Sequence, residues 1–411
     1  MTSIIGNGIM VGGGSSPVPT PATTGWSDVN FIDYDGTPLY SYTAEEFQAL
    51  TAMPANPTHS GLTSQGWNWS LADAKAQVTA MGKCNIGQMY ITSDGVTRIY
   101  IHLEEGRLSP YCGFGVNGTA VIDWGDGSST DTVTGTSVST VKNTQHVYPA
   151  AGDYVISIIV SSGSIQLFGN STYGSYILRK GTSTSGSLNR VYQNAIQKIQ
   201  VGNNCAIGAY VFYYCCSLSS ITIPSGVTSI GVGAFQYCCS LSSITIPSGV
   251  TSIGAQAFYN CYSLSGITIP SGVTSVGAQA FYNCYSLSGI TIPSGVTSIG
   301  VGAFFFCCSL SGITIPSGVT SIGVAAFQYC YSLSGITIPS GVTSVGAQAF
   351  YNCYGLSYIK FEPTTPPTVS NSDAWTNIPD DCIIYVPSGT LSDYTSATNY
   401  PSSSTYTYVE Y

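Results

Sequence analysis

The chain has 411 residues and a mass of 43.0 kDa, a size that suits two to four domains. Only 7% of the residues are charged, and 10 basic against 19 acidic side chains give a formal net charge of −9. Nucleic acids and anionic membrane surfaces are held mainly by Lys and Arg, so this balance argues against both as partners. The longest apolar runs are too short for insertion into a membrane, and residues 1–11 lack the positive start of a secretory signal.

Residues 1–25 are rich in Gly, Ser, Pro and Thr, and we expect them to form a flexible arm. Residues 26–96 are predicted to form a small α+β module, which opens with strands over 29–34 and 37–42. Between these strands lies Asp35-Gly36, a pair of residues typical of a hairpin turn. The module is therefore predicted to begin with a hairpin.

Two helices are predicted in the same module. Thr43 and Glu46 have the spacing of a capping box, in which each side chain accepts the backbone N–H of the other residue, so a helix should run from 44 to 53. A second helix should begin after Ser70 and end at Gly82, because glycine favours the end of a helix.

A second hairpin is predicted where strands over 88–92 and 96–103 flank Asp94-Gly95. With this hairpin, the sequence of 26–96 resembles the N-terminal modules of tail proteins of gut bacteriophages. The resemblance implies a virion tail as the location of the protein. It also leaves open that the N-terminal region attaches the chain to a larger particle.

Residues 33–37 read Asp-Tyr-Asp-Gly-Thr, which matches the Asp-x-Asp-Gly-Thr signature of the haloacid-dehalogenase phosphatases. The resemblance implies Asp33 as a nucleophile and Asp35 as an acid/base, working beside Mg²⁺. That chemistry needs a fully buried parallel strand before the motif and a wound α/β core after it. The strand before it alternates instead, and no β-α alternation follows. We therefore favour a non-enzymatic protein with no catalytic residues and no cofactor, and keep the phosphatase as an alternative.

Three stretches between residues 97 and 166 combine turn and strand signals. Residues 121–127 read Val-Ile-Asp-Trp-Gly-Asp-Gly, 146–148 read His-Val-Tyr, and 151–158 read Ala-Gly-Asp-Tyr-Val-Ile-Ser-Ile. Together they resemble the polycystic-kidney-disease (PKD) β-sandwich, a spacer or carbohydrate-linked accessory module of extracellular proteins. The resemblance implies a PKD-like β-sandwich over 97–166. A strand-rich connector is expected over 167–198.

Asp123 and Asp126 are the candidate metal ligands of this part, because Ca²⁺ prefers clustered carboxylate oxygens. Two carboxylates also suit a turn that is capped by side chains, and we favour this interpretation, with no metal site. The three histidines, His59, His102 and His146, are far apart in the sequence and suggest no catalytic set. His146 is expected to pack structurally in the sandwich.

A 23-residue unit repeats from Leu218 to Tyr354, and a fixed period of this length is the mark of a solenoid. Copies begin at Leu218, Leu241, Leu264, Leu287, Leu310 and Leu333, with a degenerate copy before them that begins at Ile199. The inward-facing set of the first copy is predicted to be Leu218, Ile221, Ile223, Val227, Ile230, Ala234, Phe235 and Cys238. A short helical or 3₁₀ segment is expected after Gly231. One coil has too few apolar groups to be stable alone, so the coils must stack.

The pattern Leu-x-x-Ile-x-Ile-Pro-x-x-Val-x-x-Ile-Gly-x-x-Ala-Phe-x-x-Cys resembles the BspA-type leucine-rich repeat of bacterial surface and gut-associated proteins, which are mostly adhesins and binding proteins. The resemblance implies a leucine-rich-repeat solenoid over 199–362, closed by a C-terminal cap over 363–411. The predicted fold class is mixed and mainly β. In it, the solenoid of 23-residue repeats follows a PKD-like β-sandwich and a small α+β module.

Seven of the 14 cysteines occupy one repeat position and are predicted to form a column. They are Cys215, Cys238, Cys261, Cys284, Cys307, Cys330 and Cys353. Parallel Cβ vectors argue against disulfides along this column, and the short Cys-x-x-Cys spacings of a metal site are missing. We expect buried thiols that pack as small hydrophobic side chains.

From 199 to 359 the sequence has no Asp, Glu, Lys, Arg or His. The positions that vary between copies follow the repeated Gly, Phe and Cys. Because they do not fit the inward-facing set, we expect them to be exposed, and their Tyr, Asn, Gln and Phe residues are typical of binding surfaces. The candidate ligand-binding residues are Tyr213, Tyr214, Gln236, Tyr237, Tyr259, Asn260, Tyr262, Tyr282, Asn283, Tyr285, Phe305, Phe306, Gln328, Tyr329, Tyr331, Tyr351, Asn352 and Tyr354. The alternative is that these tyrosines only stack on one another along the convex side.

The function that we favour from the sequence is recognition at a cell surface by a receptor-binding protein of a phage tail or fibre. The alternative is a bacterial surface adhesin of the BspA-type family, located at the bacterial cell surface. An uncharged surface suits a neutral surface glycan, which rings can stack against, and a protein receptor fits nearly as well. Whether the chain forms a homo-oligomer is left open.

Overall fold

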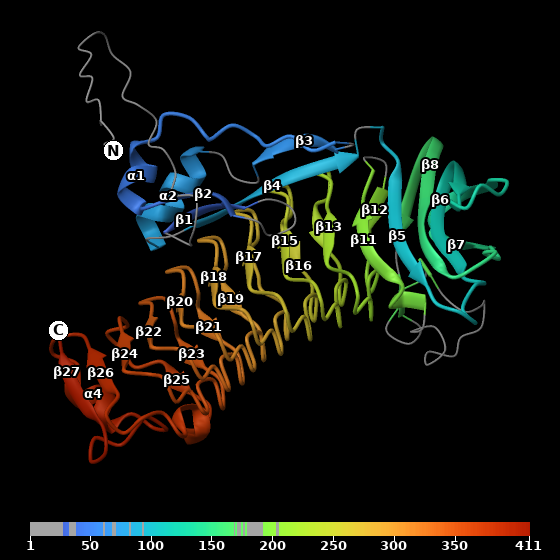
Figure 1. Ribbon diagram of the computed structural model, residues 1–411. Helices are drawn as coiled ribbons and strands as arrows, with labels where there is room; N and C mark the ends of the chain where they lie inside the picture. Colours follow the sequence, from blue (N-terminus) through green and yellow to red (C-terminus); the bar gives the residue numbers. More distant parts are fainter. Residues whose placement is uncertain are drawn as a thin grey trace, which may run out of the picture.

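The computed structural model (Figure 1) is mainly β, and its largest part is a solenoid of 23-residue coils. It describes residues 28–32, 38–60, 62–67, 71–81, 84–92, 94–167, 169–170, 174–175, 177–178, 192–202 and 205–411. The predicted arm over 1–25, the motif at 33–37 and most of the connector over 167–198 lie outside the described residues. No helix in the described part of the chain is long and apolar enough to cross a membrane.

The N-terminal module contains a four-stranded sheet and two helices. Its elements are β1 (Val29–Ile32), β2 (Pro38–Tyr42), α1 (Ala44–Ala49), β3 (Leu62–Trp67), α2 (Leu71–Met81) and β4 (Cys84–Thr92). The strand order is β2-β1-β4-β3, with β1 antiparallel to β2, as the first hairpin predicted, and parallel to β4. Phe31, Phe47 and Ile86 are fully buried in a core of this module that is separate from the core of the coils.

Both predicted helices form, and one of them is shorter than expected. The Thr43 hydroxyl accepts the N–H of Glu46, and the Glu46 carboxylate accepts the N–H of Thr43 at 2.8 Å, so the capping box is confirmed. α1 ends at Ala49 and not at 53, because Leu50 takes an extended conformation and its side chain is buried in the module core. α2 lies within the predicted range.

Residues 97–167 fold into four long strands that continue one side of the coils (Figure 1). These strands, which we call the cap sheet, are β5 (Thr97–Leu103), β6 (Tyr111–Asp123), β7 (Asp131–Gln145) and β8 (Gly152–Leu167). With β11 (Ile196–Gln200) and β13 (Ser220–Thr222) they form one sheet of order β13-β11-β5-β8-β6-β7, and β12 (Cys205–Ile207) pairs with the end of β8. The two-residue strands β9 (Gly169–Asn170) and β10 (Gly174–Ser175) pair with each other.

The strand pairing corrects the predicted PKD-like sandwich, because all four strands of 97–166 belong to a single sheet and not to two packed sheets. β6 and β8 are antiparallel over most of their length, with Gly118 opposite Gly163. Both glycines have a positive φ, and a Cβ on Gly163 would lie only 1.8 Å from the carbonyl oxygen of Asn117. The sequence motifs indicated the turns, but one of the two sheet partners of β5, β11, comes from the coils.

The hairpin predicted around Asp94-Gly95 is wrong. A turn is present there, in which the Asp94 carboxylate accepts the N–H of Val96 at 3.1 Å and pairs with Arg98. The strands on either side nevertheless enter different sheets, since β4 pairs with β1 and β3 while β5 pairs with β8 and β11. The apolar residues of β5, such as Ile99, are buried in the core that the coils share, so burial and not the turn selects the partner.

The coils contribute strands to two sides of the solenoid, and on the second side the coil with Val276 contributes an isolated bridge instead of a strand. The first side, which we call the strand face, contains β13, β15 (Ser243–Thr245), β17 (Gly266–Thr268), β18 (Gly289–Thr291), β20 (Gly312–Thr314), β22 (Gly335–Ile338) and β24 (Tyr358–Phe361). The second side contains β14 (Ser229–Ile230), β16 (Ser252–Ile253), β19 (Ser298–Ile299), β21 (Ser321–Ile322), β23 (Ser344–Val345) and β25 (Thr368–Val369). Paired strands are parallel and in register, so that Ile244 lies opposite Ile267 and Ile267 opposite Ile290.

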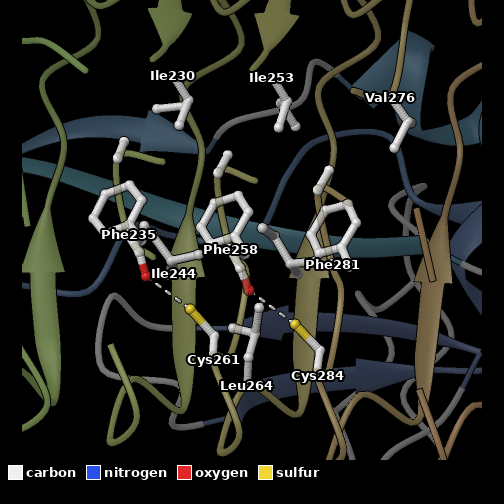
Figure 2. Packing of buried hydrophobic residues seen from close by; sticks show 14 of the residues in the cluster. Ile230, Phe235, Ile244, Ile253, Phe258, Cys261, Leu264, Val276, Phe281 and Cys284 are labelled. Carbon is white, nitrogen blue, oxygen red and sulfur yellow. Dashed lines mark hydrogen bonds between the residues drawn. The ribbon is translucent and has the colours of Figure 1, made fainter. Parts of the chain in front are cut away.

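The predicted inward-facing residues form the core of the coils, and all eight of the first copy are at most 8% exposed. Phe235, Phe258 and Phe281 are fully buried, and their rings stack in parallel at centroid distances of 5.3 and 5.4 Å (Figure 2). The buried cluster runs without a break from Ile99 in the cap sheet to Tyr394 near the end of the chain. The coils and the cap sheet are therefore one folding unit with one core.

The C-terminal residues close the last coil. They contain η1 (Ser372–Trp375), β26 (Ile383–Val386), α4 (Leu391–Ser396) and β27 (Thr407–Glu410), and β26 and β27 extend the strand face beyond β24. The Trp375 ring stacks on Phe350 at 5.2 Å and so ends the column of phenylalanine rings. Its Nε1 donates to the carbonyl of Asn399 at 3.1 Å, and the Tyr394 hydroxyl donates to Pro363 at 2.6 Å.

The N-terminal module lies on the inner side of the solenoid arc, where β4 crosses the strand face near β13, β15 and β17 (Figure 1). Exposure follows this arrangement, because Thr268 on β17 is 5% exposed whereas the equivalent Thr314 on β20 is exposed. The strand face of the first coils is thus covered by the chain itself.

Candidate functional site

The predicted binding residues lie on the third side of the coils, which we call the turn face. It comprises residues 208–216, 231–239, 254–262, 277–285, 300–308, 323–331 and 346–354. Each segment forms two tight turns and not the predicted helical or 3₁₀ segment. In 231–239 the N–H of Ala234 donates to the carbonyl of Gly231 at 3.2 Å, and that of Cys238 to Phe235 at 3.1 Å.

The third residue of each turn has a positive φ, as type II turns require. In 231–239 these residues are Gly233, with φ 58°, and Tyr237, with φ 64°. The full set is Tyr210, Tyr214, Gly233, Tyr237, Gln256, Asn260, Gln279, Asn283, Gly302, Phe306, Ala325, Tyr329, Gln348 and Asn352. The left-handed conformation costs an L-residue roughly 1–2 kcal/mol, so other interactions must hold these positions.

Hydrogen bonds between coils supply that stabilisation. A positive φ turns the central peptide of the turn along the axis of the stack. The N–H of Gly233 then donates to the carbonyl of Ala255 in the next coil at 3.0 Å, and the N–H of Tyr237 donates to Tyr259 at 2.8 Å. Every coil repeats this arrangement and donates forward along the chain. Each bond adds about 1 kcal/mol net, which offsets the backbone strain.

Both ends of this forward ladder are closed. At the start, the carbonyl of Ala209 accepts the N–H of Gly169 at 2.9 Å. At the end, the N–H of Gln348 donates to the carboxylate of Asp373 at 3.3 Å, and the N–H of Asn352 donates to the carbonyl of Thr376 at 2.9 Å. The C-terminal residues therefore supply the acceptors that the next coil would have supplied.

The candidate binding residues fall into three groups by exposure. The exposed residues are Tyr285 (41%), Tyr331 (38%) and Tyr354 (55%). The half-buried residues are Tyr213, Tyr214, Tyr237, Tyr259, Tyr262, Tyr282, Asn283, Phe305, Phe306, Tyr329 and Tyr351. The buried residues are Gln236, Asn260, Gln328 and Asn352. The structure brings all of them onto one face, but it exposes fewer of them than the sequence predicted.

The predicted exposure of the four buried residues is wrong, and the two asparagines among them bond to the following segment of the stack. The Asn260 side-chain oxygen accepts the amide of Asn283 at 2.8 Å, and Asn352 accepts the amide of Asn377 at 2.7 Å. Gln236 lies over Gly233, where a Cβ would come within 3.1 Å of the glutamine oxygen. Asn260 and Asn352 therefore hold successive segments together, while Gln236 packs within its own coil.

The aromatic rings of the turn face stack in short rows. Tyr259, Tyr282 and Phe305 stack at centroid distances of 4.6 and 4.4 Å, with ring planes within 9° of parallel. Further stacked pairs are Tyr214–Tyr237, Phe306–Tyr329, Tyr262–Tyr285 and Tyr331–Tyr354. A ring in the middle of a row, such as Tyr282, has both faces covered, and a ring in a pair has one face covered. The predicted self-stacking is therefore present, and edges and hydroxyl groups are what a row offers to a partner.

Three tyrosines of these rows resist ionisation more strongly than a phenol in water. Burial raises the pKa of Tyr259, Tyr282 and Tyr285 above the usual value for a phenol, and the neighbouring tyrosines or Cys308 add to the shift. Together with the missing charged residues, this makes the turn face an uncharged surface that carries hydroxyl and aromatic groups.

The column cysteines are confirmed as buried thiols, and the structure shows why cysteine suits the position. Cys261 donates its S–H to the carbonyl of Phe235 at 3.1 Å, and Cys284 donates to Phe258 at 3.2 Å (Figure 2). Each thiol points to the coil before it and not to the next cysteine. The column thiols are completely buried, and burial raises the pKa of Cys353 to about 12, so reagents in solution do not reach this column.

The other candidate chemistry proves to be structural where the structure describes it. Asp123 and Asp126 accept the N–H groups of Gly125 and Ser128 at 2.9 and 3.0 Å, as expected for capped turns. His146 stacks on Trp124 and lies 2.7 Å from Asp126. Within the described residues, no group of three or more His, Cys, Asp or Glu side chains could hold a metal ion. The Asp-x-Asp-Gly-Thr motif lies outside them.

One cluster escaped the sequence analysis. At the end of the strand face, beyond the part that β4 crosses, Tyr358, Lys360, Tyr385 and Tyr411 line a hollow of about 470 Å³. Lys360 lies over the Tyr411 ring at 4.0 Å. From β13 to β22 the equivalent positions are only Ser, Gly and Thr, so the change at Tyr358 could have been noticed in the sequence.

Comparison with known proteins supports the repeat assignment. Residues 205–334 and 302–379 match the family described as BspA type leucine rich repeat region, found in six copies. This part of the chain is therefore similar to BspA-type leucine-rich-repeat regions. No curated protein gives a significant match to the chain.

Solved structures with a similar chain trace include three bacterial proteins. A leucine-rich repeat protein from Bacteroides ovatus is 21% identical, covering 50% of this chain and 75% of that chain, with a TM-score of 0.28. A leucine-rich cell surface protein from Faecalibacterium prausnitzii is 22% identical, covering 61% and 89%, with a TM-score of 0.32. The pneumococcal vaccine antigen PcpA is 15% identical, covering 50% and 68%, with a TM-score of 0.33. At such identities and TM-scores, these likenesses carry no argument about function.

Proposed function

We propose that this protein is a non-enzymatic adhesin of a bacterial cell surface, which binds a partner protein through the turn face. The family match supports the surface role, because BspA-type repeats belong to bacterial surface proteins. The phage-tail assignment rests only on the resemblance of 26–96, so the adhesin is the better supported of the two readings.

The observation that carries the proposal is the exposed apolar surface of the turn face. Among the described residues, six exposed large hydrophobic side chains lie on it: Val232, Tyr285, Val301, Val324, Tyr331 and Tyr354. Charged residues are missing from the whole segment 199–359. Exposed apolar residues without charges are the composition of the centre of a protein interface.

The stacking of the inner rings supports a protein partner over the neutral glycan that the tyrosine content first suggested. A sugar stacks against the face of an aromatic ring, and in the middle of a row both faces are covered by the next rings, as for Tyr282 between Tyr259 and Phe305. The exposed edges and hydroxyl groups instead suit the side chains and backbone of a protein surface.

The proposal is tested by binding of the full chain to gut bacteria and to mucosal epithelial cells. Changing Tyr285, Tyr331 and Tyr354 to Ser should reduce binding at least tenfold, because interface aromatics carry most of the energy of an interface. The matched control changes Tyr358 and Tyr411, which are exposed on the strand face, and should bind as the unchanged chain does.

Pretreatment of the cells identifies the partner class. Digestion of surface proteins should abolish binding, whereas periodate oxidation of surface glycans should leave it intact. The opposite pattern would assign the ligand to a glycan. Equal binding by the Tyr285, Tyr331 and Tyr354 variant would remove the turn face from consideration. Immunolabelling of intact bacteria, compared with purified phage particles, separates the adhesin from the tail protein.

A further inference from the structure

The residue after each column cysteine forms a second column at the edge of the turn face. It reads Cys216, Cys239, Tyr262, Tyr285, Cys308, Tyr331 and Tyr354 along the chain. Cys216 and Cys239 are therefore neighbours in consecutive coils. Their Sγ atoms lie 3.2 Å apart. This arrangement differs from the inner column, whose thiols turn to phenylalanine carbonyls.

The stacking of the coils sets the two cysteines at a spacing that a disulfide can span, and unlike the inner column their side chains converge. Neighbouring coils are held in register by hydrogen bonds such as that from Ser240 N–H to the carbonyl of Cys216, at 3.1 Å. Strands paired in this way lie about 4.8 Å apart, within the Cα separation of roughly 4.4–6.8 Å seen in disulfides. Bond formation then has to close the sulfur–sulfur distance from 3.2 Å to about 2.05 Å.

Both thiols are also accessible to a small reagent. Cys216 and Cys239 are half-buried, whereas the neighbouring Cys215 and Cys238 of the inner column are fully buried. The Cys216 Sγ approaches the carbonyl of Tyr237 at 3.2 Å, and the Cys239 Sγ approaches the same oxygen at 3.5 Å. This shared acceptor keeps the two sulfur atoms on one side of the backbone.

We propose that Cys216 and Cys239 are an oxidation site, at which a small-molecule disulfide converts the pair of thiols into an intramolecular disulfide that joins two consecutive coils. One cysteine, as thiolate, attacks the reagent and releases one reduced thiol, which leaves a mixed disulfide on the protein. The second cysteine then attacks the protein sulfur of that bond and releases the second reduced thiol. Two protein S–H bonds and one reagent S–S bond are consumed, and one protein S–S bond and two reagent thiols are formed.

The chain contains its own control. Cys308 occupies the same repeat position, is half-buried like the pair, and has its Sγ 3.5 Å from the carbonyl of Phe306, as Cys239 does from Tyr237. Its neighbours along the column are Tyr285 and Tyr331. Cys308 therefore shares every feature of the site except a cysteine in the adjacent coil.

The test is thiol mapping of the native full chain before and after treatment with oxidised glutathione. Because no Lys or Arg lies between Lys198 and Lys360, trypsin would leave this whole segment uncut, so pepsin is used before mass spectrometry. We expect linked peptides that contain Cys216 and Cys239, two hydrogens lighter than the reduced pair, and the loss of two alkylatable thiols per chain. Cys308 should be recovered alkylated or as a mixed disulfide with glutathione, and never cross-linked within the chain.

Single variants make the result unambiguous. In Cys216→Ser and in Cys239→Ser, the remaining cysteine should stop at the mixed disulfide, as Cys308 does. Oxidation should raise the thermal midpoint of the unchanged chain by several degrees and leave both variants unshifted, because only the unchanged chain gains a cross-link. The proposal is overturned if Cys216 and Cys239 are recovered in the same form as Cys308 after oxidation, or if the link forms elsewhere.

Discussion

The coils and the cap sheet share one hydrophobic core, yet they satisfy their polar groups differently. In the coils, from 205 to 359, backbone N–H groups, amide side chains and thiols bond from coil to coil, and no side chain is ionised. In the cap sheet, His146 pairs with Asp126 and Arg107 with Glu104. In-register stacking would set any charge about 4.8 Å from its own repeat, so like charges would meet in every coil. In the cap sheet each position is unique, and a charge can meet its opposite.

The largest effect is expected from a substitution in the shared core, at the middle of the coils. Phe281→Ala should lower the free energy of unfolding by about 3–5 kcal/mol, because it opens a cavity in the column of buried rings. The measurement is the urea midpoint, followed by circular dichroism. Tyr285→Ala, on the outer column of the same coil, should change the free energy of unfolding by less than about 1 kcal/mol. Equal losses in the two variants would contradict the inner column as the source of stability.

A second variant separates backbone conformation from side-chain bonding in the coils. Asn283 combines a φ of 58° with the hydrogen bond to Asn260. Asn283→Val should lower the free energy of unfolding by about 2 kcal/mol, because a β-branched residue resists this φ and the bond is lost. Asn283→Gly keeps the conformation and should lose only about 1 kcal/mol, the hydrogen bond alone. The same loss in both variants, compared by urea unfolding, would rule out backbone strain.

The exclusion of charge from the coils is tested by stacking two carboxylates. Gln256 donates its amide to the side-chain oxygen of Gln279 at 2.8 Å. Changing both to Glu should lower the free energy of unfolding by about 1 kcal/mol at low salt, and 1 M salt should restore most of it. Gln279→Glu alone keeps the acceptor and should hardly change the free energy of unfolding. A double variant that is insensitive to salt would show that register does not forbid charge here.

The smallest expected effect belongs to the cap sheet. Burial opposes ionisation of Asp126, but hydrogen bonds from Ser128 and His146 outweigh it and lower the pKa to about 2. Because this pKa lies below the ordinary value, the stabilisation is complete above about pH 4 and is lost as the pH falls toward 2. The thermal midpoint should therefore fall less between pH 4 and 2 in Asp126→Asn than in the unchanged chain. Identical pH profiles would remove this carboxylate from the stability of the cap sheet.

Much of the coil could be predicted because repetition makes its pattern explicit. Leu241 and Ile244 recur every 23 residues with apolar character, so their burial follows from the sequence, and the capping box of Thr43 and Glu46 is equally local. The positive φ of the turn face was missed, although Gly233 and Gly302 share a repeat position with Gln256. At this repeat position, glycine in some coils indicates a positive φ in every coil.

The remaining errors concern contacts between distant segments. Asp94-Gly95 gives a turn, but nothing nearby in the sequence reveals that β5 pairs with β11 about a hundred residues later. Nor does the sequence around Thr268 indicate that β4 crosses the coil that contains this residue. Such pairings depend on which apolar surfaces of distant segments become buried against each other, and local sequence patterns do not contain that information.

The hydrogen bonds that run forward from coil to coil on the turn face give the uncharged solenoid a dipole along its axis. Each central peptide points its N–H toward the following coil, so dipoles of about 3.5 D each add along the axis as they do in an α-helix. The parallel strands add little, because their dipoles largely cancel. The end at 346–354 is therefore positive, and Asp373 meets it there with a carboxylate, as an acidic residue does at the start of a helix. A partner approaching from the side meets a neutral surface, while the two tips of the same solenoid differ in sign.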